Sequence, residues 1–569
     1  MTARRRAVKR LLLALVGAPL LVAALLAAIE LGFVLAGSDP RRHYFLPAIA
    51  AEGPRSYVAC GTPPIENTRF RVQRFPERPA AGVRRVVCVG DSTCFGHPFE
   101  PPVPYPCWIE MRLGELLPNA SIEVLNLGSN GFSSEDVLDL LEETDLAGAD
   151  VLVVYVGHNE FLDRNLLPIV NPFAHALRRA LSRSRLGTVA LECVRRPVDA
   201  RELVNRVKSE RIRDAAFLTD AELRRGADRY REHLERIVAL ATTRGARTLL
   251  VHPVADLVDT PTESSTFAAT TPDAERTRFR KVLAEAMTAR RGFQAELDRG
   301  GALEADRIAE SLRRVDELER IDAGIALCHY ERGWLLLRAG RTEEARRELQ
   351  RALDEDGAPI RLTRALHEVI DEVALTHGAI VVDPRSDLDA AAAPGLPGQN
   401  GWFIDYVHPV LRGHQLLADT ILKTMASSGV LARASEWKFQ GEPSYEEYLL
   451  RAGYRPGTYV EARARAALPL LLKSHFKDRD PAAAESARHE FLRLIDLDPK
   501  CATAWLGLGV VEAIEKRTDD ALAAFGRAAD LAPAAVEQIA TPYRTNPVVH
   551  ALFDDAGLTF RDGRIVRSK

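Results

Sequence analysis

The chain has 569 residues, of which 46% are hydrophobic and 27% are charged. This is the composition of a globular protein, and the length predicts several structural units rather than one core. The 76 basic and 79 acidic residues nearly balance, so the chain has no basic field that would favour nucleic acid as a partner. Seven scattered cysteines lack the Cys/His spacing of a metal site, and neither a metal nor another cofactor is expected.

The N-terminus carries a basic cluster followed by an apolar run. Five Lys and Arg side chains precede Leu11, and no charged side chain occurs from Leu11 to Ile29. That run is long enough to span a bilayer core of about 30 Å. A cleaved signal peptide is the alternative, although its apolar region is normally shorter and ends in a small-residue cleavage site. We favour a transmembrane anchor with the basic cluster in the cytoplasm and the remaining chain in the periplasm or outside the cell.

Regular alternation of strand and helix patterns begins near Arg85, after a proline-rich segment that favours an extended stalk with room for a short hairpin. The alternation predicts a parallel sheet with crossover helices. Strands are expected at 86–89, 122–127, 151–156, 248–252 and 379–382, and helices at 108–117, 134–141, 220–243 and 364–375.

Two regions have the spacing of tetratricopeptide repeats. Between the fourth and fifth strands, a charged helical insertion of about a hundred residues contains one partial match, at Gly333, Gly340, Ala345, Leu349 and Ala352. Near the C-terminus the pattern is clearer, at Trp505, Leu508, Gly509, Ala521, Phe525, Ala528 and Pro533, with Ala487, Phe491 and Pro499 34 residues before their equivalents. We expect these helices to pack on the α/β domain or to bind a protein partner. Ordinary helical hairpins without a binding role are the alternative.

The most informative stretch is RVVCVGDSTCFG, residues 85–96. Its apolar run stops at Gly90 and places Asp91 and Ser92 at the carboxyl end of a buried strand, where a parallel sheet opens its ligand crevice. Ser92 is therefore a candidate nucleophile. For the short GDS sequence taken alone, helix capping is the alternative interpretation.

Other strand ends supply the groups that a serine nucleophile requires. The second and third strands end in NLGSNG and VYVGHNE, which contain Gly131 and Asn159. Their backbone and side-chain N–H groups are candidate donors to an oxyanion. After the fifth strand, Asp405 precedes His408 by three residues, so its carboxylate can accept from Nδ1–H and leave Nε2 free to take the serine proton.

These four blocks, present in order, resemble the GDSL or SGNH hydrolases. The resemblance covers about residues 85–262 and 361–430. It implies a flavodoxin-like, three-layer α/β hydrolase domain without a cofactor. By residue, it implies a catalytic triad of Ser92, Asp405 and His408, and an oxyanion hole of Ser92, Gly131 and Asn159.

Two departures from the family pattern are visible. The helical insertion is absent from the minimal family member, and Glu160 follows Asn159 where many members have Asp. We interpret Glu160 as a structural carboxylate that orients its loop. Cys94 is interpreted as a packing thiol, His97 as a loop residue and His414 as a helix residue.

The resulting division of the chain is 1–37, basic N-terminus and anchor; 38–84, stalk; 85–262, first segment of the hydrolase domain; 263–360, helical insertion; 361–430, second segment of the hydrolase domain; 431–465, linker; 466–545, tetratricopeptide-like repeats; and 546–569, tail. The sequence predicts a membrane-anchored serine esterase, or an O-acyltransferase of the same chemistry, acting on an ester of an extracytoplasmic glycan or lipid. The alternative is a repeat scaffold with an inactive hydrolase-like domain.

Overall fold

The structure is a computed structural model. It describes residues 18–38, 45–48, 56–59, 74–99, 103–162, 165–193, 212–214, 216–298, 301–398, 401–439, 447, 451, 456–472, 483–533, 536–537, 540, 543–544, 547–561 and 564–568.

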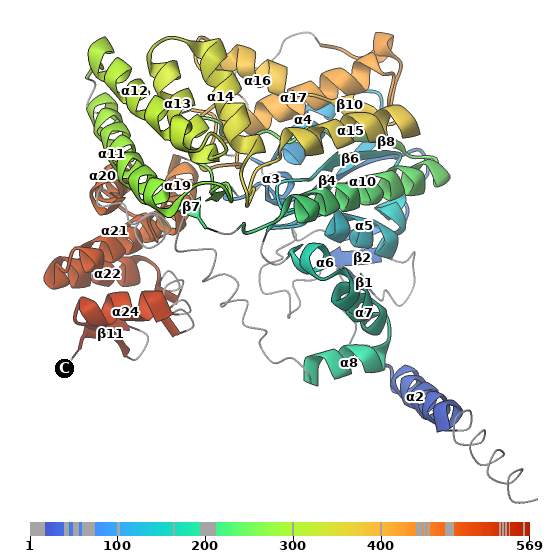
Figure 1. Cartoon of the computed structure of the whole chain (residues 1–569). Helices are drawn as coiled ribbons and strands as arrows, with labels where there is room; N and C mark the ends of the chain where they lie inside the picture. The colour runs from blue at the N-terminus through green and yellow to red at the C-terminus, as the bar shows by residue number, and fades with distance from the viewer. Residues whose placement is uncertain are drawn as a thin grey trace, which may run out of the picture.

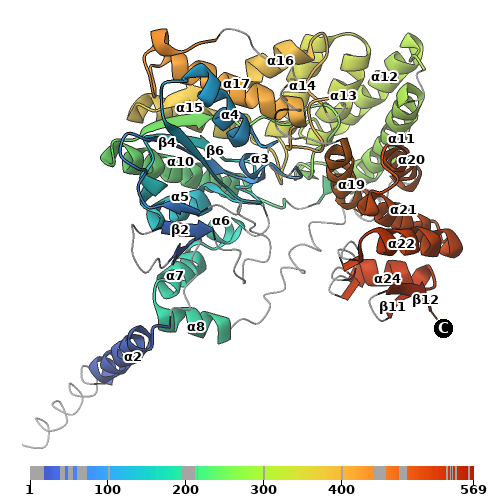
Figure 2. The ribbon, with the colours of Figure 1, turned by 180° about the vertical axis from the view of Figure 1, so that it is seen from behind.

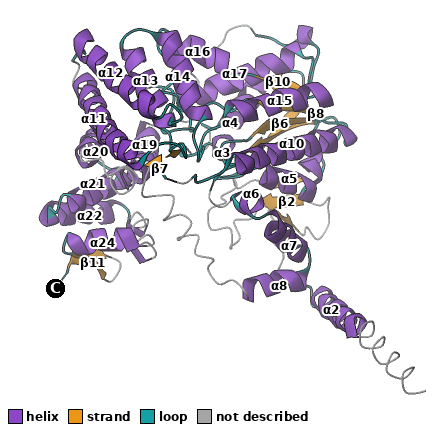
Figure 3. Cartoon of the chain, viewed as in Figure 1, coloured by secondary structure: helices purple, strands orange, loops and turns teal. Residues whose placement is uncertain are grey.

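A five-stranded parallel sheet forms the centre of the chain (Figure 3). Its strands are β4 (Arg84–Gly90), β5 (Ile122–Gly128), β6 (Val151–Tyr155), β8 (Arg247–Val251) and β10 (Ile380–Val382). They lie in the order β5-β4-β6-β8-β10, which is the 2-1-3-4-5 order of flavodoxin-like folds. The five predicted strands are confirmed with small shifts at their ends.

Helices cover both faces of this sheet (Figure 1). Val87 and Val89 of β4 pack in one core with α5 (Ser134–Glu143), α10 (Asp220–Thr243) and α15 (Arg364–His377). Val86 and Cys88 point to the opposite core, with α4 (Tyr105–Leu116) and α17 (Leu411–Ser427). The alternation of side chains along β4 thus builds a three-layer α/β domain.

Glycines allow the chain to approach itself closely where β4 and β5 end. A Cβ on Gly90 would lie 1.9 Å from the carbonyl oxygen of Tyr155, and one on Gly128 would lie 2.4 Å from the backbone nitrogen of Phe95. The short helix α3 (Ser92–Phe95) therefore packs directly against the end of β5. No side chain larger than hydrogen fits at either position.

The insertion between β8 and β10 is helical, as predicted. It consists of α11 (Asp273–Asp298), α12 (Ala305–Ile321), α13 (Ala326–Arg338) and α14 (Thr342–Asp354), which share a separate core. In the hairpin of α13 and α14, a Cβ on Gly333 would lie 2.6 Å from Leu349 Cγ. The small residue at this repeat position thus lets the two helices pack closely. Helix α16 (Arg385–Ala392) follows β10.

The C-terminal region is also helical. It contains α19 (Pro456–Leu472), α20 (Ala483–Leu497), α21 (Ala502–Ile514), α22 (Thr518–Leu531) and α24 (Pro547–Asp555), followed by β11 (Leu558–Arg561) and β12 (Arg564–Arg567). Helix α19 begins inside the segment interpreted as a linker. Figure 2 shows this helix beside the α/β domain, where Ala462 and Ala466 pack against Phe99 and Ile404. Helix α19 precedes the residues that carry the repeat pattern, so the expectation that the repeat helices themselves pack on the α/β domain or bind a partner stays a prediction.

The N-terminal region begins with α2 (Ala18–Leu35). The start of the predicted anchor, 11–17, lies outside the described residues. Within the residues that are described, no helix combines the length and the apolar character needed to cross a membrane. The predicted stalk contains three short antiparallel strands, β1 (Phe45–Ala48), β2 (Ser56–Ala59) and β3 (Arg74–Pro76).

Three short helices follow β6, and a small strand pair joins a strand before α10 to a strand after β8. The helices are α6 (Leu167–Val170), α7 (Pro172–Ser182) and α8 (Arg185–Cys193), and the strands are β7 (Ile212–Arg213) and β9 (Ser265–Thr266). In Figure 1 the helices lead away from the sheet toward α2.

We expect Gly128→Ala to destabilise the fold by about 1–3 kcal/mol, because the added methyl group would overlap the backbone of α3. Gly114→Ala is the matched control. Gly114 lies exposed in α4, and its added methyl group would meet no other heavy atom, so this change should raise stability by roughly 0.5–1 kcal/mol. Chemical unfolding of the full chain measures both effects, and equal stability of the two variants would contradict the predicted overlap.

Candidate active site

Ser92 is the first residue of the single-turn helix α3, two residues after β4 ends at Gly90. Asp91 caps this turn, and its Oδ1 accepts a hydrogen bond of 2.9 Å from the backbone N–H of Thr93. The turn ends at Gly96, whose φ of 97° is in the left-handed region that favours glycine. Ser92 is half-buried, while its neighbours Asp91 and Thr93 are buried. The side chain is therefore rigidly supported and still accessible.

Asp405 and His408 lie in the loop between α16 and α17. One carboxylate oxygen of Asp405 accepts from the backbone N–H groups of Val407 (3.0 Å) and His408 (2.9 Å). The other lies 2.6 Å from Nδ1 of His408. The local turn thus orients the imidazole through both the backbone and the side chain.

The structure brings Ser92 and His408 together. Nε2 of His408 lies 2.6 Å from Oγ of Ser92, although the two residues are 316 positions apart. Because the Asp405 carboxylate can only accept, Nδ1 carries the proton and Nε2 is left to accept from the hydroxyl of Ser92. A second contact between the two loops joins Thr93 Oγ1 to the carbonyl oxygen of Val407, at 3.4 Å.

The charges of this group of side chains support proton transfer. Burial by itself would lower the pKa of His408, but the negative charge and hydrogen bond of Asp405 outweigh it and raise that pKa above the ordinary value. For Asp405, burial acts to raise the pKa, and His408 together with the backbone N–H donors reverses this and lowers it. The carboxylate therefore stays ionised and stabilises a positive charge on the imidazole.

Gly131 and Asn159 lie in the loops that follow β5 and β6, the two strands on either side of β4. Both are half-buried, as Ser92 is. One N–H of the Asn159 amide donates to the carbonyl oxygen of Phe132 at 2.9 Å, which ties the two loops together. A side-chain amide has two N–H groups, so the second can serve a substrate oxygen.

Glu160 has the structural position expected from the sequence. Its carboxylate accepts from the backbone N–H and the hydroxyl of Ser134, both at 2.8 Å, at the start of α5. The same hydroxyl lies 2.8 Å from Nδ1 of His233 on α10. Burial raises the pKa of Glu160 to about 7. The carboxyl group holds the Asn159 loop on α5, and the Ser134 hydroxyl links this contact to α10.

Two groups near the site were not assigned a role from the sequence. The His97 ring lies 4.8 Å from the His408 ring, centroid to centroid, and burial, assisted by the positive charge of His408, lowers the pKa of His97 to about 4. Burial also raises the pKa of Asp91 to about 7. In the sequence, the only sign that His97 and Asp91 lie near the site is their closeness to Ser92 along the chain. Cys94 is buried, in agreement with its interpretation as a packing thiol.

Helix α19 borders the loops that carry this site. Ala462 and Ala466 form a small apolar core with Phe99, which follows α3, and with Ile404 and Leu411, which flank the Asp405 loop. The C-terminal region therefore supports both sides of the Ser92–His408 contact.

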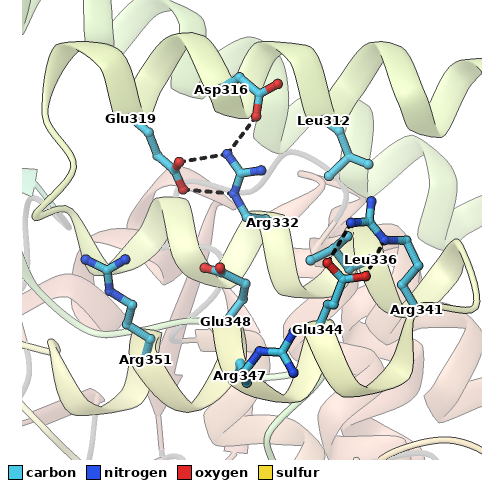
Figure 4. A pocket seen from close by; sticks show the side chains of 10 residues that line it. All are labelled: Leu312, Asp316, Glu319, Arg332, Leu336, Arg341, Glu344, Arg347, Glu348 and Arg351. Carbon is cyan, nitrogen blue, oxygen red and sulfur yellow. Dashed lines mark hydrogen bonds and ion pairs between the residues drawn. The ribbon is translucent and has the colours of Figure 1, made fainter.

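A separate charged pocket of about 470 Å³ lies among α12, α13 and α14 of the insertion (Figure 4). Here the described residues offer one group of ligand atoms close enough for a metal ion, from Glu319, His329 and Glu348. Those atoms already have partners, because His329 Nδ1 lies 2.8 Å from Glu348 and Arg332 donates to Glu319 at 2.8 Å. Arg332 would compete with a cation for the Glu319 carboxylate.

Comparisons with known proteins show only weak overall similarity. No protein-family model matches the chain, and no curated protein matches it. Similar solved structures include an alpha/beta hydrolase enzyme from the metagenome of Lake Arreo, Spain, with 13% identity, a TM-score of 0.29 and coverage of 61% of this chain and 96% of that one. An acetylxylan esterase from Geobacillus stearothermophilus has 12% identity, a TM-score of 0.28 and coverage of 60% and 94%. TesA has 11% identity, a TM-score of 0.26 and coverage of 60% and 98%.

We expect Asp405→Asn to lower kcat by about 10⁴-fold, because the amide no longer stabilises the imidazolium or selects its tautomer. The pH profile should change as well. His408 must be neutral to accept a proton, so kcat/KM of the parent should fall as the pH drops through a pKa above the ordinary histidine value. Removing the carboxylate lowers that pKa, and the acidic limb should move to lower pH. An unmoved limb would contradict this coupling.

We expect Asn159→Ala to lower kcat by about 10²–10³-fold with a smaller change in KM, since an oxyanion donor acts mainly in the transition state. Asn165→Ala is the control, because Asn165 contacts the same loop through the Asn159 carbonyl oxygen at 2.7 Å without being a predicted donor. Steady-state kinetics on an activated ester compares the two. Equal losses would indicate loop support rather than oxyanion binding.

Proposed function

We propose that this protein is a serine hydrolase, or an O-acyltransferase of the same chemistry, that forms an acyl-enzyme on Ser92. The observation that carries the proposal is the continuous series of hydrogen-bonding contacts from Ser92 Oγ through His408 to Asp405, each 2.6 Å long between side chains. This arrangement has the three groups that a serine nucleophile needs: the hydroxyl, a base, and a carboxylate that orients the base.

In the first half of the reaction, Ser92 Oγ attacks the carbonyl carbon of an ester while its proton passes to Nε2 of His408. The carbonyl π electrons move to oxygen, giving a tetrahedral oxyanion. Backbone N–H groups of Ser92 and Gly131 and the amide of Asn159 are the proposed donors to that oxygen. Collapse breaks the bond to the alcohol, which takes the proton from His408 and leaves the acyl group on Ser92.

In the second half, an oxygen nucleophile attacks the acyl-enzyme and gives its proton to His408. Collapse of the resulting tetrahedral intermediate breaks the bond between the acyl carbon and Ser92 Oγ, which takes the proton back from His408. Water produces hydrolysis, and a sugar hydroxyl produces transfer.

The sequence arguments for an N-terminal anchor lead us to propose a membrane-attached protein with its active site in the periplasm or outside the cell. The proposed substrate is accordingly an ester of an extracytoplasmic glycan or lipid.

Labelling of the full chain with a fluorophosphonate tests the nucleophile. We expect one labelled residue, Ser92, and loss of both labelling and ester turnover, by about 10⁴-fold or more, in Ser92→Ala. Ser427→Ala, at the exposed end of α17, is the control and should label as the parent does. Labelling that survives Ser92→Ala would contradict the assignment.

The alternative is a scaffold with an inactive hydrolase-like domain, favoured by the helical C-terminal region and its packing on the α/β domain. Turnover of p-nitrophenyl esters from acetyl to long acyl chains, with and without sugar acceptors, separates the proposals. Acyl-sugar formation identifies a transferase, free acid alone identifies a hydrolase, and no turnover of any ester supports the scaffold.

A further inference from the structure

Helix α7 has an unusual orientation: its charged face points toward the protein. His175 and Arg179, four residues apart, lie on one face of the helix. His175 Nε2 is 2.9 Å from a carboxylate oxygen of Glu135, and Arg179 forms ion pairs with Glu135 and Asp139 of α5. Arg229 of α10 also contacts Glu135, at 2.9 Å. These contacts determine which way α7 faces.

The opposite face of α7 is apolar and exposed. Phe173, Leu177 and Leu181 follow one another at four-residue intervals and therefore form a single stripe. Phe173 is 79% exposed and Leu177 is 52% exposed, and no residue of α7 is buried. A helix that packs on a soluble protein normally has the reverse arrangement, with its apolar side inward. The stripe is thus available to an apolar partner.

A second exposed apolar surface, on α2, is connected to the stripe through α8, although α2 and α7 are far apart in the chain. The Glu30 carboxylate of α2 accepts hydrogen bonds of 3.0 Å from the backbone N–H groups of Arg185 and Leu186, at the start of α8, and from the hydroxyl of Ser184. Helix α8 directly follows α7, and the contact between α2 and α8 is visible in Figures 1 and 2. Leu21, which is 75% exposed, is one of nine exposed large apolar side chains on α2.

Positive charge accompanies the apolar surface. Arg178 and Arg183 are exposed beside the stripe, and neither forms an ion pair with another described residue. An exposed apolar stripe with flanking arginines suits the boundary between headgroups and acyl chains of an anionic bilayer, because the arginines can meet lipid phosphates while the apolar side chains enter the membrane.

We propose that α7, together with α2, contacts an anionic lipid bilayer, so that α7 is an interfacial helix which sets the orientation of the α/β domain on the membrane. The inference rests on the membrane attachment proposed above and adds a second contact point to it. Two points of contact, joined by the Glu30 contact with α8, restrict how the domain can rotate relative to the bilayer. The α/β domain is then held at a defined height and angle relative to the bilayer.

The test uses the full chain reconstituted in vesicles of phosphatidylcholine and phosphatidylglycerol, with and without brominated phosphatidylcholine. Phe173→Trp places a fluorophore on the stripe, and subtraction of the parent spectrum removes the emission of the five native tryptophans. We expect this emission to shift to the blue and to be quenched by brominated lipid. Leu375→Trp, at an exposed position of α15, is the matched control and should be neither shifted nor quenched.

Quenching of Phe173→Trp no greater than that of Leu375→Trp would overturn the inference. A blue shift without quenching would also overturn it, because the stripe would then be covered by protein, such as a second copy of the chain. Leu177→Trp repeats the measurement if Phe173→Trp does not fold.

Two separate measurements distinguish this inference from the proposals on which it depends. Carbonate extraction of the parent chain tests whether the chain is firmly anchored. If the chain stays in the membrane but the tryptophan at position 173 is not quenched, the interfacial helix is contradicted and the anchor is not. If the tryptophan is quenched but carbonate removes the chain, the interfacial contact is supported and the anchor is contradicted. Turnover of a soluble ester, measured for the parent chain and for Phe173→Trp, tests catalysis independently. If the parent chain turns over no ester, the proposed catalytic activity fails, but the quenching result still tests the contact of α7 with lipid.

Discussion

The contact between Ser92 and His408 depends on the position of two loops that are 316 residues apart in the chain. Parallel strands make this possible, since β4 and β10 end at the same edge of the sheet even though β6 and β8 lie between them. The helical insertion does not disturb that edge. Ile380 of β10 pairs with Leu249 of β8 in regular register after more than a hundred intervening residues, so the insertion forms its own core outside the sheet.

Burial gives the carboxyl groups around the site different chemical character. Asp405 has a positively charged neighbour and several N–H donors, and its pKa is lowered. At Asp91 and Glu160 burial outweighs the hydrogen bonds that these carboxyl groups accept, and the pKa of each rises to about 7. The ionised carboxylate of Asp405 can stabilise an imidazolium, whereas Asp91 caps the turn at Ser92 and Glu160 supports the Asn159 loop. Residue type alone does not distinguish these roles.

The C-terminal and N-terminal helical regions are joined to the α/β domain by specific contacts, the first beside the active site and the second near the proposed membrane surface. Ala462 and Ala466 of α19 pack against residues beside both catalytic loops, so movement of the C-terminal helices would alter the support of Ser92 and His408. At the other end of the chain, Glu30 joins α2 to α8. The α/β domain is thus connected to one helical region beside its site and to another that carries exposed apolar surface.

The sequence by itself determined much of this protein's organisation. Apolar runs and their periodicity located the five strands and the main helices, because local burial patterns follow the geometry of each element. Ser92, Gly131, Asn159, Asp405 and His408 were grouped from strand-end positions and a family resemblance, and their catalytic roles remain predictions. Only the tertiary structure decided which side chains meet: the 2.6 Å contact of His408 with Ser92, the approach of His97, the packing of α19 on the site, and the outward apolar face of α7. These features depend on long-range packing and on the balance of charge between elements, which the order of residues along one element does not reveal.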